Sequence, residues 1–552
     1  MTASGDLAKL GTDYWDWRME SDPVAATFIG DHRFNDRLAD ISTAGRKKEK
    51  SRATELRKRL STIDRTELGE SEQASADILD ISLEEIVEEQ KHKFWQWNVD
   101  QLAGPQVSVF EQVNYHPYRN DKDVRDLVAR FDALPGFIRD YISNLREGMK
   151  EKRVAPNVAV RRVIGQLKEI ESTPTEKSPL AAACDKTKKD ALKAEVRRAI
   201  ETSVKPAFGG LLDFLQTEYQ GRDAVGLGAT PGGLDAYQYR CWIRTTTDLS
   251  YRKIHELGLE ELEGIRAEMI GIARKLGHKG DIPGFIAKIS ADPANQPASA
   301  ADVIACFQAA FERAQKALPK WFGILPKRKC EIKPIESFRE KDAPAAYYYP
   351  ADEAGTRNGI YYANTYKPES RLKFNANALT VHEAVPGHHL QVSIAQEQKS
   401  LPPYRRHGFF TAYVEGWALY TERLAVEMGL YQDDLERFGM LTYQALRACR
   451  LVVDTGMHAM GWSRQKAIDF MTAHVAESGT EIANEIDRYI IWPGQALAYK
   501  IGQREIVRLR AGAEKKLGAA FDIRAFHDVV LRNGAVPLST LGRIVASWVK
   551  KR

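Results

Sequence analysis

The chain has 552 residues, which is enough to bury a large hydrophobic core and to form more than one structural unit. Its 80 basic and 75 acidic residues are interleaved, so the net charge of +5 points to no nucleic-acid partner. The five cysteines are widely spaced and include no CxxC pair, which indicates neither a disulfide framework nor a thiolate zinc site and favours a reducing compartment.

The first part of the chain has the pattern of helices. In residues 71–97, Ala, Ile and Leu recur at intervals of three and four, which predicts a helical array. A glycine-rich break at 221–233 marks a soft boundary, so we expect an N-terminal helical lobe over 1–224 and a second lobe over 225–552. No basic and apolar leader pattern and no run of about 18 apolar residues occurs, so we expect a cytoplasmic protein without a membrane partner.

Residues 345–366 are the exception to the helical pattern. Aromatic and small residues alternate there around a polar turn that contains glycine. Such alternation predicts a β-hairpin, placed just before the most informative segment of the chain.

That segment, VHEAVPGHHLQ (381–391), contains three histidines and a glutamate next to a Pro-Gly pair. A zinc hydrolase needs two neutral imidazoles and a third protein ligand on the metal, an open position for water, and a carboxylate that takes the proton of that water. His382 and Glu383 open the familiar HExxH arrangement, but the next histidines come later than that arrangement requires. The segment therefore predicts a zinc site of unusual spacing.

Two histidines compete for the second metal position. On an ideal helix His388 would point about 120° away from His382, and His389 would lie about 10 Å further along the axis. The Pro-Gly pair at 386–387 can end the helix and turn one of them back toward the metal, and the spacing does not decide which. The alternative is a helix that ends here with the histidines as its C-terminal cap.

A candidate third ligand lies on the next helix. Residues 411–429 have the spacing of a helix that ends at a glycine, and Glu415 lies in its first half, with Glu422 on the same face. A carboxylate from this helix would complete a His-His-Glu site. The alternative is an ordinary exposed glutamate.

A long helix is predicted over residues 433–461. Arg447, Arg450, Asp454 and His458 fall at intervals of three and four on it, while its other faces are apolar enough to be buried. A buried ionisable stripe must be paired or face a wet cleft, and a salt-bridge network is as good an explanation as a functional one. Asp454 and His458 also have the spacing of a carboxylate–imidazole pair.

Two tyrosines near the end of the chain are candidate electrophilic helpers. A tyrosine hydroxyl beside zinc can donate to the oxyanion of a tetrahedral intermediate. Tyr489 is the first choice and Tyr499 the second. The alternative for either residue is a core tyrosine with a satisfied hydroxyl.

Several segments together resemble a bacterial family that is catalogued as a domain of unknown function and grouped with the gluzincin metallopeptidases. These segments are HEAVPGHHLQ (382–391), YVEGWALYTERL (413–424), LRACRLVVDTGMHAMGW (446–462) and EIDRYIIWPGQALAYKIGQ (485–503). In gluzincins two histidines and a glutamate bind zinc, and the EGWA unit also resembles the glutamate-ligand helix of a family of zinc aminopeptidases. The stretches 233–259 and 358–366 follow the same family pattern, so the resemblance covers roughly 225–510.

The resemblance implies a role for each residue of the motif. His382, His388 and Glu415 become the zinc ligands and Glu383 the general base. His388 is preferred because the PGH unit belongs to the family motif, and His389 is left with a positioning or substrate-facing role.

The resemblance also suggests where substrate binds. In gluzincins a strand beside the zinc helix binds extended peptide through its backbone. Gly359 to Asn364 would be this substrate rail, with Tyr362 and Asn364 at the substrate. A small buried hairpin is an equally good explanation of the segment.

The sequence as a whole predicts a mainly α, two-lobed zinc metallopeptidase with a small β element beside the catalytic helix and a cleft between lobes. Zn²⁺ is the expected cofactor and a short peptide or peptide-like molecule the expected substrate, with Glu383, His458 and Tyr489 in catalysis. One alternative is a zinc hydrolase of a non-peptide amide or ester. Another is a binding protein that kept the fold, although Glu383 argues against it because a structural metal site needs no general base.

Overall fold

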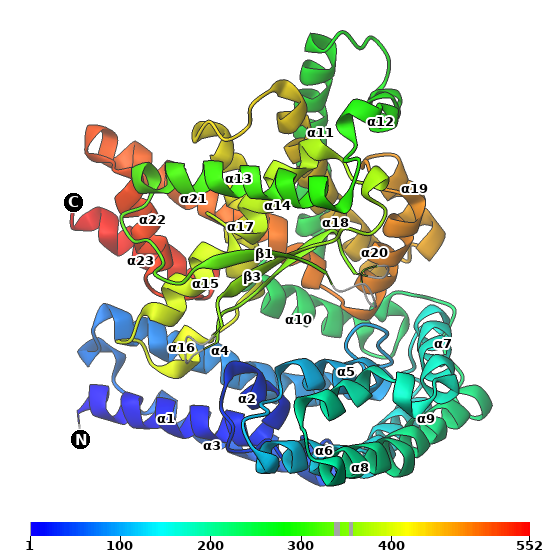
Figure 1. The fold of residues 1–552 in the computed structure, drawn as a ribbon. Coiled ribbons are helices and arrows are strands. Elements are labelled where there is room, and N and C mark those ends of the chain that lie inside the picture. The colour runs from blue at the N-terminus through cyan, green and yellow to red at the C-terminus, as the bar shows by residue number, and fades with distance from the viewer. Residues whose placement is uncertain (1, 336–339, 341–342, 353–356) are drawn as a thin grey trace. The chain divides into compact units, whose positions relative to one another are not determined.

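The computed structural model describes residues 2–335, 340, 343–352 and 357–552. Helices dominate this part of the chain and a single small sheet accompanies them, which confirms the predicted mainly α class (Figure 1). The chain divides into two compact units, Met1–Ala236 (unit 1) and Tyr237–Arg552 (unit 2), and the division falls inside helix α10 (Gly233–Thr245). In the described ranges no helix is both long enough and apolar enough to cross a membrane.

Unit 1 is an all-helical array. Its helices are α1 (Ala3–Ser21), α2 (Pro23–Ile29), α3 (Thr43–Ser61), α4 (Glu70–His92), α5 (Pro105–Tyr115), α6 (Asp121–Lys150), α7 (Asn157–Ser172), α8 (Asp190–Ala199) and α9 (Lys205–Thr217). The helix predicted over 71–97 is α4, which ends at His92 and is followed by a short 3-10 turn, Phe94–Trp97.

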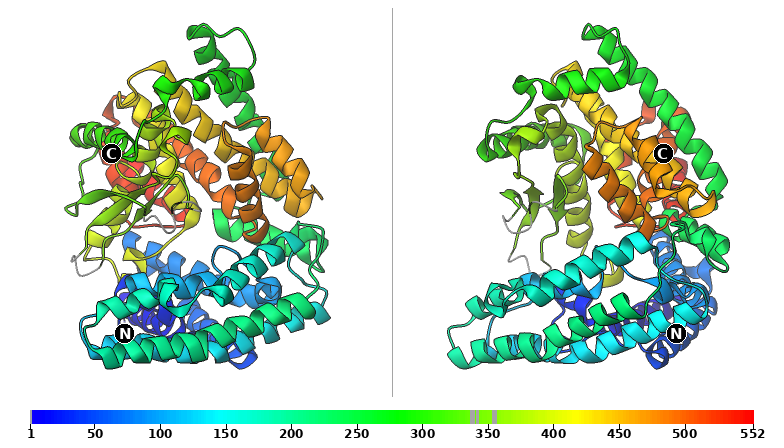
Figure 2. Two further views of the ribbon diagram at one scale, coloured as in Figure 1. Left: turned by 45° about the vertical axis from the view of Figure 1, so that its right-hand side comes forward. Right: turned by 90° about the vertical axis from the view of Figure 1, so that its right-hand side faces the viewer.

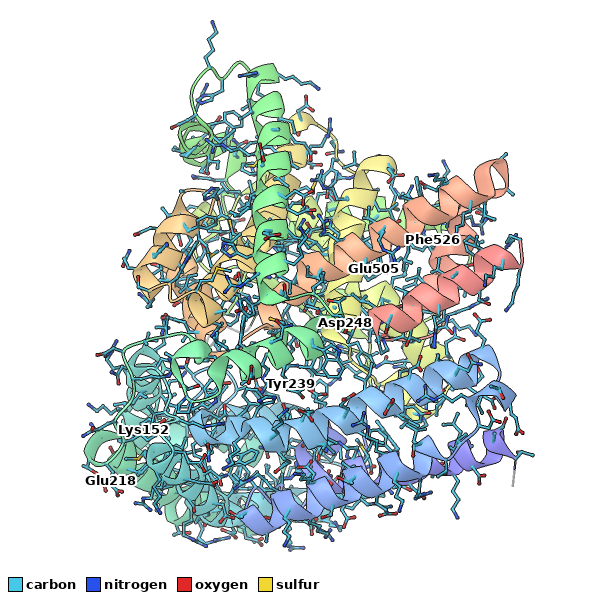
Figure 3. The ribbon with its side chains drawn as sticks, turned by 180° about the vertical axis from the view of Figure 1, so that it is seen from behind. Lys152, Glu218, Tyr239, Asp248, Glu505 and Phe526 are labelled. Carbon is cyan, nitrogen blue, oxygen red and sulfur yellow. The ribbon has the colours of Figure 1, made fainter. Side chains whose placement is uncertain are left out.

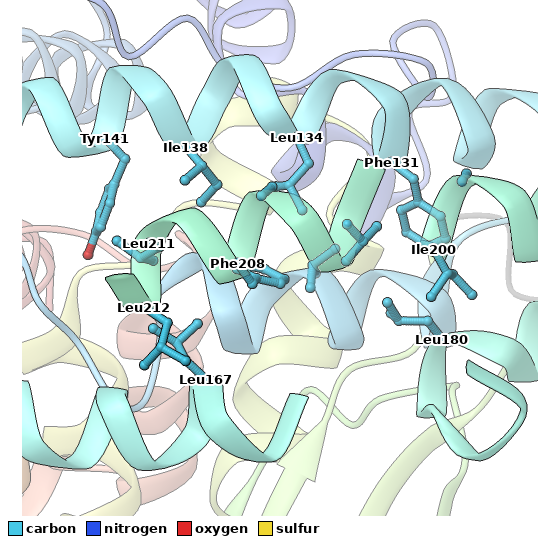
Figure 4. Packing of buried hydrophobic residues seen from close by; sticks show 14 of the residues in the cluster. Phe131, Leu134, Ile138, Tyr141, Leu167, Leu180, Ile200, Phe208, Leu211 and Leu212 are labelled. Atoms are coloured by element: carbon cyan, nitrogen blue, oxygen red, sulfur yellow. The ribbon is translucent and has the colours of Figure 1, made fainter. Parts of the chain in front are cut away.

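The core of unit 1 forms where α6 packs against its neighbours. Phe131, Leu134 and Ile138 of α6 are buried in one hydrophobic cluster with Phe208 and Leu211 of α9 (Figure 4). An ion pair on the surface also links α6 to the end of α9. Glu218, labelled in Figure 3, follows α9 and binds Arg146 of α6 at 2.7 Å. Burial of this apolar surface accounts for the stability of the array.

Unit 2 holds the predicted site. Its helices after α10 are α11 (Tyr251–Lys275), α12 (Ile282–Ala291), α13 (Ala300–Trp321), α14 (Ala376–Glu383), α15 (His388–Glu397), α16 (Pro403–Arg406), α17 (Thr411–Glu427), α18 (Asp434–Ala459), α19 (Arg464–Thr472), α20 (Gly479–Ile491), α21 (Ala498–Leu517), α22 (Ile523–Leu531) and α23 (Leu538–Lys550). The helices predicted over 411–429 and 433–461 are α17 and α18. Within this unit α11 packs along α18 (Figure 2).

A three-stranded sheet lies next to α14. Its strands are β1 (Cys330–Pro334), β2 (Ala346–Tyr349) and β3 (Gly359–Ala363), in the order β1-β3-β2. Strand β3 is parallel to β1 and antiparallel to β2, and the antiparallel pair confirms the predicted hairpin. Residues 353–356 of its turn lie outside the described residues.

The sheet order overturns the predicted substrate rail. Strand β3 is the central strand, so its backbone is paired on both sides and has no open edge for a peptide. Tyr362 of β3 stacks on Tyr347 of β2, with ring centroids 5.0 Å apart. Asn364 is buried, and its amide donates to three carbonyls, those of Glu340, Ala343 and Pro344. Both residues therefore hold the hairpin together.

Helices α17 and α21 meet backbone to backbone. A Cβ atom at Gly416 would lie 2.5 Å from the Cα atom of Gly502, and one at Gly502 would lie 1.8 Å from the carbonyl oxygen of Ala412. Only glycine permits this approach, so the glycine of the EGWA unit serves helix packing. The close contact brings the start of α21 alongside Glu415.

Candidate metal centre

The predicted break in the HEAVPGHH segment is present. Helix α14 ends at Glu383, and α15 begins at His388. A Cβ atom at Gly387 would lie 1.9 Å from the carbonyl oxygen of His382, so the tight turn requires glycine. Trp417 of the EGWA unit holds the turn from α17, since its indole nitrogen donates to the carbonyl of Pro386 at 2.9 Å.

The break brings His382 and His388 together with Glu415 of α17. The two imidazole rings lie 4.9 Å apart and nearly perpendicular to each other. The Glu415 Oε2 atom is 3.7 Å from His382 Nε2 and 3.4 Å from His388 Nε2. One ligand atom from each residue lies within 4.8 Å of the other two.

These separations fit a zinc ion. Two donor atoms that bind zinc at about 2.1 Å with a tetrahedral angle lie about 3.4 Å apart. The two measured nitrogen–oxygen distances are close to that value, and two nitrogens with one carboxylate oxygen are a donor set of catalytic zinc sites. The three residues would therefore hold zinc and leave a fourth position for water.

The surrounding charges favour a cation between these side chains. Burial lowers the pKa of a histidine, but the carboxylates of Glu415 and Glu422 outweigh it and raise the pKa of His382 to about 9. Burial also disfavours charge on Glu415, yet the nearby imidazoles of His382 and His388 keep the pKa of Glu415 below its usual range.

Glu422 is a functional candidate that the sequence reasoning did not select. Its Oε1 atom lies 2.8 Å from His382 Nδ1, which leaves the Nε2 atom of that histidine to face Glu415. Its other oxygen accepts from the amide of Gln444 at 2.8 Å, and Gln444 accepts from the buried ammonium of Lys500 at 2.7 Å. A carboxylate that orients a ligand histidine is typical of zinc sites. The signal was present, because Glu422 follows Glu415 by two helical turns.

His389 does not share the metal set. It is buried, its Nδ1 atom lies 3.1 Å from the hydroxyl of Tyr348, and its Nε2 atom lies 3.1 Å from the carbonyl of Arg328. Burial lowers the pKa of His389 to about 4, so the ring is neutral at pH 7. His389 thus braces strand β2 through Tyr348.

Glu383 reaches the open edge of the sheet. Its Oε2 atom accepts a hydrogen bond from the backbone N–H of Tyr348 in β2, at 2.9 Å. The N–H of Tyr348 therefore points away from β3, and so do the N–H and C=O of Ala346, two residues earlier. Among the described strands, β2 rather than β3 is thus the edge strand, and it lies beside Glu383.

Tyr499 lies in the electrostatic field of Glu415, whereas Tyr489 belongs to a separate charge network. Burial and then the nearby charge of Glu415 raise the pKa of Tyr499. The hydroxyl of Tyr489 is instead engaged by Arg450, whose Nε atom lies 2.6 Å away, and by the carboxylate of Glu485. The structure therefore reverses the predicted order of the two tyrosines.

The residues of the predicted polar stripe lie at different distances from the metal set along α18. Arg447 lies one turn after Gln444, the residue that contacts Glu422, whereas His458 lies about 21 Å further along the axis than Gln444. The Nε2 atom of His458 is bonded to the carbonyl of Tyr489 at 2.9 Å. The structure thus does not bring His458 to the metal set.

The expected pair between Asp454 and His458 is also corrected. Asp454 accepts from the hydroxyl of Tyr237 at 2.5 Å and from the N–H of Gly494 at 3.1 Å. Burial raises the pKa of Asp454 to about 7. This carboxyl therefore joins three segments of the core, α10, α18 and the turn before α21.

The chain matches the family described as "Bacterial protein of unknown function (DUF885)" over residues 23–545. It belongs to this family. Among solved structures, a protein of Colwellia psychrerythraea described as a "putative lipoprotein" is similar over the full length of both chains, with 27% identity and a TM-score of 0.94. A "putative lipoprotein of unknown function" of Shewanella oneidensis is similar over 98% of this chain and 99% of its own, with 20% identity and a TM-score of 0.76. A comparison with curated proteins found no match.

Proposed function

We propose that this protein is a zinc-dependent hydrolase, of the gluzincin metallopeptidase type, that cleaves amide bonds of short peptides or peptide-like molecules. The observation that carries the proposal is the His382, His388 and Glu415 set with Glu383 next to it. A purely structural zinc site has four protein ligands and needs no base. Three ligands with an adjacent carboxylate are typical of a catalytic site.

The chemistry would be divided between the metal and two groups of the protein. A bound zinc ion would polarise the scissile carbonyl and lower the pKa of water. The Glu383 carboxylate would take the proton of the attacking water and return it to the leaving amine. The Tyr499 hydroxyl, which senses the charge of Glu415, would donate to the oxygen that becomes negative in the transition state.

The open edge of β2 supports a peptide as substrate. Ala346 offers an N–H and a C=O that point away from β3, on the same strand that contacts Glu383. An extended peptide can pair with such an edge through its own backbone. This pairing would hold a peptide bond beside the general base.

The test is metal analysis joined to a peptide digest. The purified protein should carry about one zinc per chain and should lose hydrolysis of a peptide mixture, read by mass spectrometry, after chelation. Glu383→Gln should keep its zinc and lower turnover by roughly 10²–10⁴. Undiminished hydrolysis by protein shown to be free of metal would overturn the proposal, and loss of zinc from Glu383→Gln would make Glu383 a ligand.

A further inference from the structure

Arg447 is a buried cation whose charge is not matched. It is 8% exposed, yet it forms no hydrogen bond and no ion pair within the part of the chain that the structure describes. Its guanidinium instead faces aromatic rings, 5.1 Å from the ring centre of Tyr443 and 6.0 Å from that of Tyr499. Taking a guanidinium out of water without a partner is costly, so its position needs an explanation.

The neighbours of Arg447 add positive charge. Arg450 and Arg488 both bind the same oxygen of Glu485, each at 2.8 Å. Arg450 is 6% exposed and keeps a second buried nitrogen, Nη1, without a hydrogen-bond partner. Near Tyr489 and Tyr499 there are thus three guanidinium groups, and the carboxylate of Glu485 pairs with only two of them.

A second carboxylate nearby does not neutralise the positive charge of Arg447. Half-buried Glu477 senses the charge of Arg447, but burial and then the proximity of Glu481 raise the pKa of Glu477 to about 8. At pH 7 this group is therefore mostly neutral. Glu481 itself is exposed.

The unmatched charge lies next to the metal set. Gln444, one turn before Arg447 on α18, binds the carboxylate that orients His382. Tyr499, whose ring faces both Arg447 and Arg450, lies in the field of Glu415. An anion held by Arg447 would therefore be within reach of a molecule bound at the metal.

We propose that Arg447, assisted by the free nitrogen of Arg450, binds a carboxylate of the substrate, so that the preferred substrates are peptides with either a free C-terminal carboxylate or an acidic side chain. The inference rests on the proposed function, because it names the substrate class of the same site. A guanidinium presents two parallel N–H groups, which match the two oxygens of a carboxylate. Binding of that carboxylate supplies the partner that Arg447 lacks.

Two pentapeptide libraries test the preference. Both are randomised at every position, and one carries a free C-terminal carboxylate while the other ends in an amide. The zinc-loaded protein should cleave carboxylate-bearing peptides at least about tenfold more efficiently than uncharged amides, in kcat/KM. Dependence on the terminus identifies the C-terminal carboxylate, and enrichment of Asp or Glu in cleaved amides identifies a side chain. Equal cleavage of uncharged amides would overturn the inference.

Arg447→Gln tests the residue. The variant should lose the preference, mainly through a higher KM, while it cleaves uncharged amides within about threefold of the wild-type rate. Arg437→Gln is the matched control, because Arg437 lies on the same helix, has a half-exposed side chain and pairs with Asp434 at 3.2 Å. Equal slowing on all peptides, or an unchanged preference, would show that Arg447 serves the fold.

A conservative variant and a binding measurement complete the test. Arg447→Lys keeps the charge without the two-pronged donor and should reduce the preference at least about threefold, which applies even if Arg447→Gln does not fold. Calorimetry with zinc-loaded Glu383→Gln should show that penta-alanine with a free carboxylate, or Ala-Ala-Glu-Ala-Ala amide, binds at least about tenfold more tightly than penta-alanine amide. Such binding without any cleavage by the wild type would refute the proposed function alone, whereas equal affinities would refute the carboxylate site.

Discussion

Among individual residues, Glu422 has a role that one substitution can test, the orientation of the His382 imidazole. It is buried in α17, and it touches the imidazole of His382 rather than the position of the metal. A carboxylate in this position fixes which imidazole nitrogen faces the metal and makes that nitrogen more basic. The quality of the metal site therefore depends on a residue that would bind no metal itself.

Glu422→Gln should lower the affinity for zinc by roughly 10–100-fold, because a neutral amide polarises His382 less than a carboxylate does. The affinity can be measured by competition with a chelating dye. Glu427→Gln, an exposed change on the same helix at a residue that pairs with Arg510, should leave the affinity as it is. Equal affinities for wild type and Glu422→Gln would contradict the orienting role.

The two tyrosines should separate in a kinetic experiment. Tyr499→Phe should lower kcat by about 10²–10³ with zinc content unchanged, because it removes a donor near Glu415. Tyr489→Phe should leave kcat nearly unchanged and instead lower the free energy of unfolding by about 1–2 kcal/mol, because Arg450 and Glu485 lose a buried partner. The opposite result would restore the order that the sequence suggested.

Among the helices, the crossing of α17 and α21 positions both the proposed metal ligand Glu415 and the proposed hydrogen-bond donor Tyr499. Glu415 precedes Gly416, and Tyr499 precedes Gly502 by nearly one turn, so the glycine contact sets the distance between the two functional side chains. A larger residue at either glycine must separate the helices. The packing of the crossing and the geometry of the site are therefore coupled.

Gly416→Ala should lower the free energy of unfolding by about 1–3 kcal/mol, because its methyl group would overlap the backbone of α21. Zinc affinity should fall with it. Gly271→Ala, at an exposed position of α11, has open space and should be neutral or slightly stabilising. Urea unfolding of both variants makes the comparison, and equal stabilities would mean that the helices adjust without cost.

The sequence predicted the positions of helices and strands better than it predicted which of them pair or pack together. Periodicity located α17 and α18, alternation located the hairpin, and the Pro-Gly pair located the break between α14 and α15. The open strand was misassigned because β3 pairs on its other side with β1, a short strand that no local pattern marks. Which edge stays open is decided by that pairing.

Two further errors have physical causes of the same kind. Four ionisable residues at helical spacing predict one face, but a face that runs along α18 extends past the site, so His458 ends far from Gln444. The choice between Tyr489 and Tyr499 depends on the contact between Gly416 and Gly502, which lie far apart in the sequence. A local sequence pattern shows neither where the site lies along α18 nor which distant glycines meet.

Across the whole molecule, the division into two units has a consequence for zinc binding. The predicted ligands all belong to unit 2, whereas the packed core of α6 and α9 belongs to unit 1. A ligand stabilises the part of a protein whose opening would release it. Zinc should therefore protect one unit more than the other.

Hydrogen exchange read by mass spectrometry checks this expectation. Addition of zinc to chelated protein should slow exchange in α14, α15 and α17 and leave exchange in α6 and α9 unchanged. The helices of unit 1 thus serve as an internal control in the same sample. Uniform slowing throughout the chain would mean that the two units open together.

The break between α14 and α15 also bears on the order of folding. Because the chain turns back within a few residues, all three proposed metal ligands come from the short stretch between positions 382 and 415, and the loops to be closed around an ion would be small. Small loops cost little entropy, so an ion can join these three helices before distant partners such as α11 and α21 arrive. Zinc supply during synthesis would then set how much folded protein a cell obtains, in addition to how active that protein is.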